Sequence, residues 1–248
     1  MRHTILKKTG VASFGGLLLL AAAGIWHGAG TAEQNENAMY LVCTKENAEN
    51  GVPFEVTDGA GLRALLDADS VLWYEEDGEL ELLDLPDEGA DDTYYEDYQW
   101  NLDLIGADAA FVRGFCGQSV RVGVLDSGVN PHPDLADRLL PGHNYIENAK
   151  HPDDTTDEFG HGTKMAGLIA GSGEHGCIGA TPTAEIVPLK CTDGQTVRVS
   201  VLCSAIYGAI DDYGCNVLNL SLEVSMDYQA LTDALSPCRR SRQRALSC

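Results

Sequence analysis

The chain has 248 residues, 44% of them hydrophobic, and a formal net charge of −22. This apolar share excludes a wholly disordered chain, and the length allows one large core or two smaller ones. The charge is concentrated between positions 33 and 108, which hold 22 acidic and two basic residues. Such a segment repels polyanions, so we expect no nucleic-acid partner and no attraction to an anionic membrane surface.

The first 32 residues have the three parts of an export signal. A positively charged start at 2–8 precedes an apolar run at 11–25, and Gly30-Thr31-Ala32 offers a small-residue cleavage site. The alternative is an uncleaved membrane anchor, because residues 9–26 approach the length that spans a bilayer. Glycines and alanines dilute this run, which favours cleavage. In both cases we expect a secreted or cell-surface protein.

Residues 38–85 predict a small α+β domain. A strand at 39–42 is followed by helical spacing at 61–68, a β-rich run at 70–74 and weak alternation at 79–83. A unit of this size is marginal alone and needs a neighbour that covers its apolar face. Residues 86–99 are acidic, contain a proline and a glycine, and are expected to form a linker.

After a helical stretch at 100–111, the sequence predicts a buried strand that ends in a carboxylate. The run Val120-Arg-Val-Gly-Val-Leu-Asp126 is apolar apart from one arginine and is followed by Ser127 and Gly128. An apolar run that ends abruptly is typical of a buried parallel strand. Open α/β folds place their chemistry at the carboxyl edge of such strands, so Asp126 is a candidate functional residue.

A histidine stands at the start of the next predicted helix. Gly160-His161-Gly162-Thr163 leads into a run of apolar and small residues at 165–171, which favours a closely packed helix. An aspartate at a strand end and a histidine at a helix start are two members of a nucleophile–base–orienter set. Taken singly, Asp126 could equally be a cap and His161 a buried structural histidine.

The remaining sequence continues the alternation of strands and helices. We expect strands at 143–146, 185–190 and 216–222, an amphipathic helix at 197–213 that ends at Gly214, and a further helix at 226–235. This alternation implies a parallel sheet with right-handed crossovers. Eight cysteines permit disulfides in an exported chain, but no cysteine or histidine spacing favours a zinc site.

Six stretches of the sequence resemble motifs of the subtilisin-like serine protease family. In chain order they are Trp100-Asn-Leu-Asp-Leu-Ile-Gly106, Val122-Gly-Val-Leu-Asp-Ser-Gly128, His132-Pro-Asp-Leu135, Gly160-His-Gly-Thr163 with Ala166-Gly167, Ile178-Gly-Ala-Thr-Pro182, and Val217-Leu-Asn-Leu-Ser221. One such motif would be weak evidence, whereas six in the family's order are specific. The resemblance implies an α/β fold with a doubly wound parallel sheet, a partial peptidase domain at 100–235, and a secreted serine endopeptidase.

The resemblance also implies roles for particular residues. Asp126 would hold the tautomer of His161, the catalytic base that takes a proton from a serine. Ser221 and Leu222 would belong to a wall on which an extended peptide substrate pairs as an added strand. Glu223 replaces the family's glycine after them, and this anion either favours basic side chains or blocks the site. Residues 38–85 resemble the family's pro-segment, which would make them the chain's own partner.

The resemblance breaks near the end of the sequence. The family's nucleophile lies in a Gly-Thr-Ser turn, after an oxyanion asparagine, and neither follows Leu222. Residues 236–248 instead place four of the chain's ten arginines within six positions. We expect an aberrant basic tail, from a frame change or misjoined end; the alternative is a genuine basic tail. The sequence as written predicts a truncated member that does not cut peptides.

Three classes of function are compatible with these patterns. The first is the serine endopeptidase, and the second is a non-catalytic peptide-binding or inhibitory protein. The third and weakest is a metal-dependent hydrolase built on Asp126, His132, His143 and His161. We expect no cofactor. Calcium is left open, although no loop shows the regular acidic spacing of a calcium site.

Overall fold

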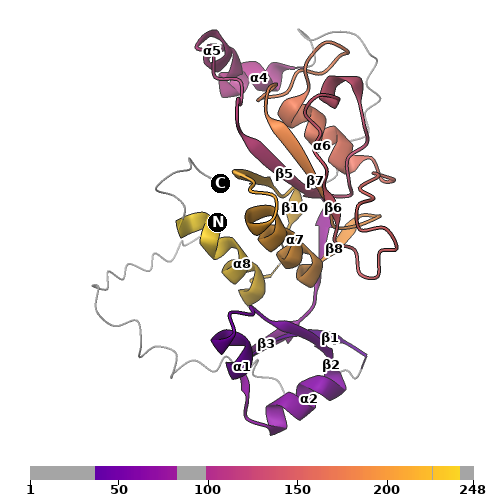
Figure 1. Ribbon diagram of the computed structural model, residues 1–248, viewed down its shortest axis with the longest axis vertical. Helices are drawn as coiled ribbons and strands as arrows, with labels where there is room; N and C mark the ends of the chain where they lie inside the picture. The colour runs from indigo at the N-terminus through magenta and orange to yellow at the C-terminus, as the bar shows by residue number, and fades with distance from the viewer. Residues whose placement is uncertain (1–36, 83–98, 225, 241–248) are drawn as a thin grey trace, which may run out of the picture.

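The computed structural model describes residues 37–82, 99–224 and 226–240. The expected export signal lies outside these residues, as do all but the last residue of the expected linker and the end of the expected basic tail. The described residues form a small α+β unit at one end and a larger α/β unit above it (Figure 1).

The small unit is a three-stranded antiparallel sheet with two helices. Its sheet order is β2-β1-β3, and its elements are β1 (Met39–Thr44), α1 (Lys45–Glu49), β2 (Glu55–Asp58), α2 (Gly59–Asp67) and β3 (Val71–Glu76). Side-chain caps fix both helix starts. Thr44 forms a capping box with Asn47, and Asp58 accepts a hydrogen bond from the backbone of Gly61 at 2.8 Å.

The two faces of β1 bury different partners because side chains alternate along a strand. Tyr40 and Val42 pack with Leu62 of α2. Leu41 points to the other face, is fully buried, and joins a core that includes Leu202 and Leu231 of the larger unit. The larger unit is therefore the neighbour that this small unit requires.

A parallel sheet of order β6-β7-β5-β9 forms the centre of the larger unit. Its strands are β5 (Arg121–Asp126), β6 (His143–Asn144), β7 (Glu185–Lys190) and β9 (Val217–Asn219). A short 3-10 helix, η1 (Pro133–Leu135), lies between β5 and β6.

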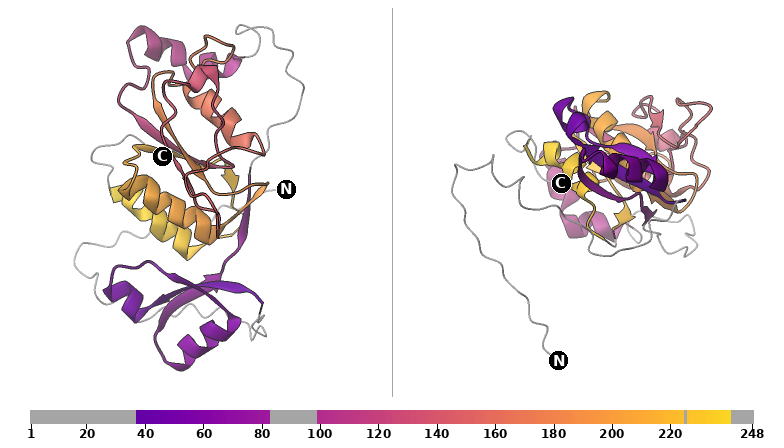
Figure 2. Two further views of the ribbon diagram at one scale, coloured as in Figure 1. Left: turned by 45° about the vertical axis from the view of Figure 1, so that its right-hand side comes forward. Right: turned by 90° about the horizontal axis from the view of Figure 1, so that it is seen from below.

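Helices cover both faces of this sheet. Val124 and Ile186 pack with Met165 of α6 (His161–Ala170) in one core. Val187 and Leu189 pack in the other core with α7 (Val199–Asp211) and α8 (Gln229–Arg240). Figure 2 shows α7 and α8 side by side, between the parallel sheet and the small unit. This arrangement confirms the predicted doubly wound α/β class.

A third sheet joins the two units. β4 (Glu79–Leu82) follows the small unit in the chain and lies between β8 (Thr196–Arg198) and β10 (Leu222–Glu223) of the larger unit. Both pairings are antiparallel. Leu80 and Leu82 are buried, whereas Glu79 and Glu81 are exposed, so β4 presents one apolar and one charged face.

Pairing with β4 also explains where the larger unit differs from the sequence-based expectation. The helix expected at 197–213 begins at Val199, because the preceding residues form β8. The strand expected at 216–222 is split, and Ser221 lies between β9 and β10 rather than in a strand.

Two further helices depart from their expected bounds. Gly106, with a φ of 71°, divides the helical stretch at 100–111 into α4 (Trp100–Ile105) and α5 (Ala107–Val112). α8 continues to Arg240, past the change in composition at 236. None of the described helices combines the length and hydropathy of a bilayer-spanning segment. Six cysteines in the described part of the chain are free thiols.

Candidate active site

The carboxylate at the end of β5 and the imidazole at the start of α6 meet in the interior. Nδ1 of His161 lies 2.8 Å from Oδ1 and 2.9 Å from Oδ2 of Asp126. Asp126 is fully buried and His161 is 3% exposed. With Nδ1–H donating to the carboxylate, the tautomer of the ring is set and Nε2 carries the basic lone pair.

Two glycines allow α6 to approach the end of β5 this closely. A Cβ at Gly162 would overlap the carbonyl oxygen of Gly128 and lie 3.0 Å from the Cβ of Asp126. Gly128 itself has a φ of 111°, and a Cβ there would press on the backbone of the 155–156 loop. The Asp-Ser-Gly and Gly-His-Gly-Thr motifs therefore pack against each other in close contact, and their glycines make room for this contact.

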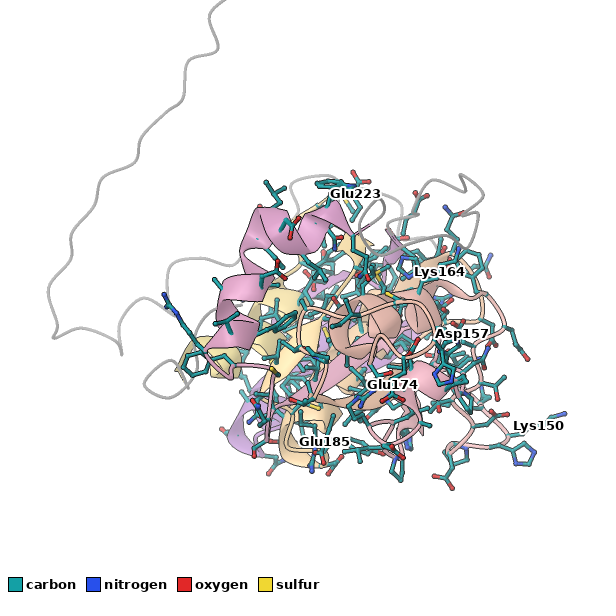
Figure 3. All side chains as sticks on the ribbon, turned by 90° about the horizontal axis from the view of Figure 1, so that it is seen from above. Lys150, Asp157, Lys164, Glu174, Glu185 and Glu223 are labelled. Carbon is teal, nitrogen blue, oxygen red and sulfur yellow. The ribbon has the colours of Figure 1, made fainter. Side chains whose placement is uncertain are left out.

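Asp157 ties the start of α6 to the loop before it. Its Oδ1 accepts a hydrogen bond from the backbone of Gly160 at 2.7 Å, and its Oδ2 accepts one from the backbone of Thr163 at 2.8 Å. The Thr163 hydroxyl donates to the same Oδ2. Asp157 is 4% exposed and acts as a buried N-terminal cap (labelled in Figure 3).

Ser127 and Asn130 connect this cap to the end of β5. Ser127 Oγ accepts a hydrogen bond from the backbone of Gly162 at 3.1 Å and lies 2.8 Å from Oδ1 of Asp157. The side chain of Asn130 donates to the backbone carbonyl of Asp157 at 2.8 Å and accepts from its N–H at 3.0 Å. One network thus fixes both ends of the Asp126–His161 pair.

The two buried carboxylates differ in their electrostatics. Burial raises the pKa of Asp126, and hydrogen bonds from His161 and Ser127 oppose this rise without cancelling it. Burial also raises the pKa of Asp157. There the hydrogen bonds from Thr163, Gly160 and Ser127 prevail, so its pKa lies below the ordinary value. Asp157 is therefore a firmly ionised anchor, whereas the charge of Asp126 depends on its hydrogen-bond donors.

The expected substrate wall carries an added strand. Leu222 pairs with Leu82 and Glu223 with Glu81, so a segment of the chain itself lies extended along β10. The opposite edge of this added segment faces β8 and the residue before it, and there the backbone N–H of Leu82 donates to the carbonyl of Gln195 at 2.7 Å. Ser221 is half-buried, and its hydroxyl accepts a hydrogen bond from Asn219 at 3.1 Å.

The structure contradicts the metal-dependent alternative. His143 lies on β6, which β7 separates from the β5 strand of Asp126. Its ring stacks at a tilt on Tyr145, with the centroids 4.6 Å apart. His132 is half exposed and lies 3.9 Å from Asp134 instead. Across the described ranges, no three His, Cys, Asp or Glu side chains are arranged to hold a metal ion.

The fold and the buried pair together define an α/β protein of the subtilisin-like type. Residues 117–246 match the model of the subtilase family, and this match covers more than half of the chain. The chain therefore belongs to the subtilase family, a family of serine endopeptidases.

Individual relatives agree with this assignment. The chain is 31% identical over 140 residues to the minor extracellular protease Epr of Bacillus subtilis, covering 56% of this chain and 21% of Epr. It is 36% identical over 126 residues to subtilisin BL of Lederbergia lenta, covering 50% of this chain and 44% of that protein. The chain thus spans less than half the length of these relatives.

A solved structure shares the fold. Fervidolysin from Fervidobacterium pennivorans, described as a keratinolytic enzyme related to subtilisin, superposes with a TM-score of 0.59 at 19% sequence identity. The superposition covers 80% of this chain and 37% of fervidolysin.

Several residues around the pair were not singled out from sequence. Asp157 was missed because it lies four residues before His161, the first residue of α6, and sequence patterns mark an N-cap only at the residue directly before a helix. Asn130 gave no local signal either, because its partners lie 27 residues away. Asp126 and His161 are in contact as expected, and their catalytic role stays a prediction.

The close approach of α6 to β5 can be tested with a pair of glycine variants. Gly162→Ala should lower the free energy of unfolding by about 1–3 kcal/mol, because the new methyl group overlaps the backbone of Gly128. Gly167→Ala is the matched control on the same helix, where a Cβ meets no heavy atom within 4 Å. It should be neutral or stabilise the helix. Urea unfolding measures both, and equal effects would contradict the role of Gly162.

The role of Asp157 predicts a pH-dependent loss of stability. Because its folded pKa is lowered, its ionised form stabilises the fold above the unfolded pKa, and this contribution is lost as pH falls through the folded value. Asp157→Asn should lower the free energy of unfolding by about 2 kcal/mol at neutral pH. The difference in the free energy of unfolding between wild type and Asp157→Asn should become smaller as the pH falls into the acid range.

Asp153→Asn, an exposed carboxylate in the same loop, is the control and should change little. A difference between wild type and Asp157→Asn that stays constant across the acid range would contradict the assigned role of Asp157.

Proposed function

We propose that this chain carries the acid–base part of a serine endopeptidase site. The supporting observation is the bond from His161 Nδ1 to both carboxylate oxygens of Asp126, inside two motifs that fit each other. Asp126 orients the ring. Nε2 then takes the proton of a serine hydroxyl as that hydroxyl attacks a peptide carbonyl, and returns it to the leaving amine.

We further propose that the groove between β8 and β10 binds the substrate. A peptide in this groove gains backbone hydrogen bonds on both sides, and pockets for alternate side chains supply selectivity. β4 supports this proposal, because it occupies the groove as an extended strand with Leu80 and Leu82 buried. Ser221 and Leu222 are the expected residues of the wall.

By the same reasoning, the small unit is the chain's own pro-segment. β4, which follows this unit in the chain, fills the groove, and two acidic residues of the unit cap helices of the larger unit. Glu75 accepts hydrogen bonds from the backbone of Gln229 and Ala230 at the start of α8, at 2.8 and 2.9 Å. Asp77 accepts from the backbone and hydroxyl of Ser200 in the first turn of α7, at 2.9 and 2.6 Å.

We propose that the 248 residues alone do not hydrolyse peptides. From Glu223 to Cys248 the sequence contains neither a glycine nor an asparagine, so a Gly-Thr-Ser turn and an oxyanion asparagine are both missing there. Loss of one triad member leaves about 10³–10⁴-fold catalysis over water, supplied by the oxyanion hole and by binding. Without the serine and the asparagine, the share that the oxyanion hole supplies is lost as well, and binding alone does not cut a peptide.

The second candidate function is a peptide-binding or inhibitory protein without catalysis. The occupied groove favours it, because strand binding needs no nucleophile. Under both functions we propose secretion through the N-terminal signal, with membrane attachment only if that signal is not cleaved. The partners are a peptide or protein substrate and the pro-segment, without a cofactor or nucleic acid.

The orienting role of Asp126 predicts one tautomer for His161. Nitrogen-15 NMR of the histidines should show Nδ1–H in the wild type, because the carboxylate accepts that proton. Asp126→Asn should abolish this preference, since an amide can turn its NH₂ toward the ring. Exposed His132 is an internal control whose signals should not change. An Nε2–H tautomer in the wild type would contradict the proposed base.

The absence of catalysis is tested separately with a fluorophosphonate probe, which labels activated serines. The purified 248-residue chain should label no more than its heat-denatured form. Labelling of the native chain that disappears in His161→Ala would reveal an activated serine and overturn the proposed inactivity. It would leave the Asp126–His161 assignment intact.

A further inference from the structure

The strand in the groove has one favourable and one unfavourable charged neighbour. The register places Glu79 opposite Arg198 of β8, and Glu81 opposite Glu223 of β10. All four side chains are exposed. Figure 3 labels Glu223 at the rim of the molecule.

Interactions between side chains on neighbouring strands determine which peptide strands bind in this groove. Directly opposed residues of antiparallel strands have Cβ atoms about 4.5–5.5 Å apart, so opposite charges attract and like charges repel. The buried Leu80 and Leu82 hold β4 in the groove through its apolar face. The exposed face then discriminates between strands that bury the same apolar side chains.

We propose that Glu223 makes the groove selective for peptides with a lysine or arginine at the position that Glu81 occupies. Arg198 favours an acidic residue two positions earlier, and the buried positions 80 and 82 require apolar residues. The preferred segment is therefore acidic–apolar–basic–apolar. This inference rests on the proposed peptide-binding function of the groove and names its substrate class.

The chain's own strand departs from this preference at one position only. It reads Glu-Leu-Glu-Leu at 79–82, so its third residue places a carboxylate opposite that of Glu223. A basic peptide with the same leucines is the stronger occupant. The pro-segment-like strand is thus built to be displaced by the substrates that the groove prefers.

Charge variants of the full chain test this selectivity, with hydrogen exchange of the amides at 79–82 as the readout. Glu81→Lys should raise their protection factors about five-fold over wild type, and Glu81→Gln should give an intermediate value. In the Glu223→Gln background, the advantage of lysine over glutamine should disappear. The gain should also shrink in 1 M salt, where surface charges are screened within about 3 Å.

Glu79→Lys is the matched control. It changes the net charge of this acidic chain by the same amount on the same strand, but it faces Arg198 and should lower protection. Equal gains from Glu79→Lys and Glu81→Lys would show a general charge effect and overturn the proposal. So would a lysine advantage that persists with Glu223→Gln.

The same measurement separates this inference from the proposed function. If the amides at 79–82 exchange without protection in every variant, the strand groove itself is wrong, and the peptide-binding function fails with it. If they are protected but respond equally to glutamine and lysine at position 81, the groove stands and only the basic preference is overturned.

Discussion

The bond between Asp126 and His161 constrains the whole larger unit. A buried carboxylate and a buried imidazole are tolerable only when their polar atoms are satisfied, so β5 and α6 must meet within hydrogen-bond distance. That requirement explains the glycines at 128 and 162, which remove the side chains that would hold the two elements apart. It also explains Asp157, whose hydrogen bonds hold the first turn of α6 in place. The pair is therefore organised before any substrate binds.

The small unit stabilises the larger one through helix ends as well as through apolar contact. The first turns of α7 and α8 both have backbone N–H groups that helix geometry leaves without partners. Glu75 and Asp77 satisfy several of these groups and place negative charge at the positive ends of two helix dipoles. Asp77 is 7% exposed, so its hydrogen bonds are largely shielded from water. Folding of α7 and α8 is thus linked to the presence of the N-terminal unit.

Local patterns were enough to predict the strand that ends at Asp126, the helix that starts at His161 and the alternation that makes the sheet parallel. These features depend on neighbours within a few residues. Local patterns gave the wrong secondary structure where pairing with a distant strand determines the backbone conformation. Residues 197 and 198 were expected to begin a helix, yet they belong to β8 because β4, more than 110 residues earlier, pairs with them. The end of the strand expected at 216–222 likewise pairs with β4, as the separate strand β10, and no local signal marks this partner. The role of Asp157 was likewise not readable, because it lies outside the N-cap position of α6 and reaches the helix only through the folded loop.

The central position of β4 between β8 and β10 has a consequence for how strongly the groove is occupied. As long as β4 remains covalently joined to the larger unit, it competes for the groove as an intramolecular ligand, at an effective concentration that does not fall on dilution. A free peptide must overcome that local excess to enter. One cut in the connecting segment would turn this intramolecular strand into an ordinary ligand, whose occupancy falls on dilution. Opening of the groove would then depend on protein concentration as well as on sequence.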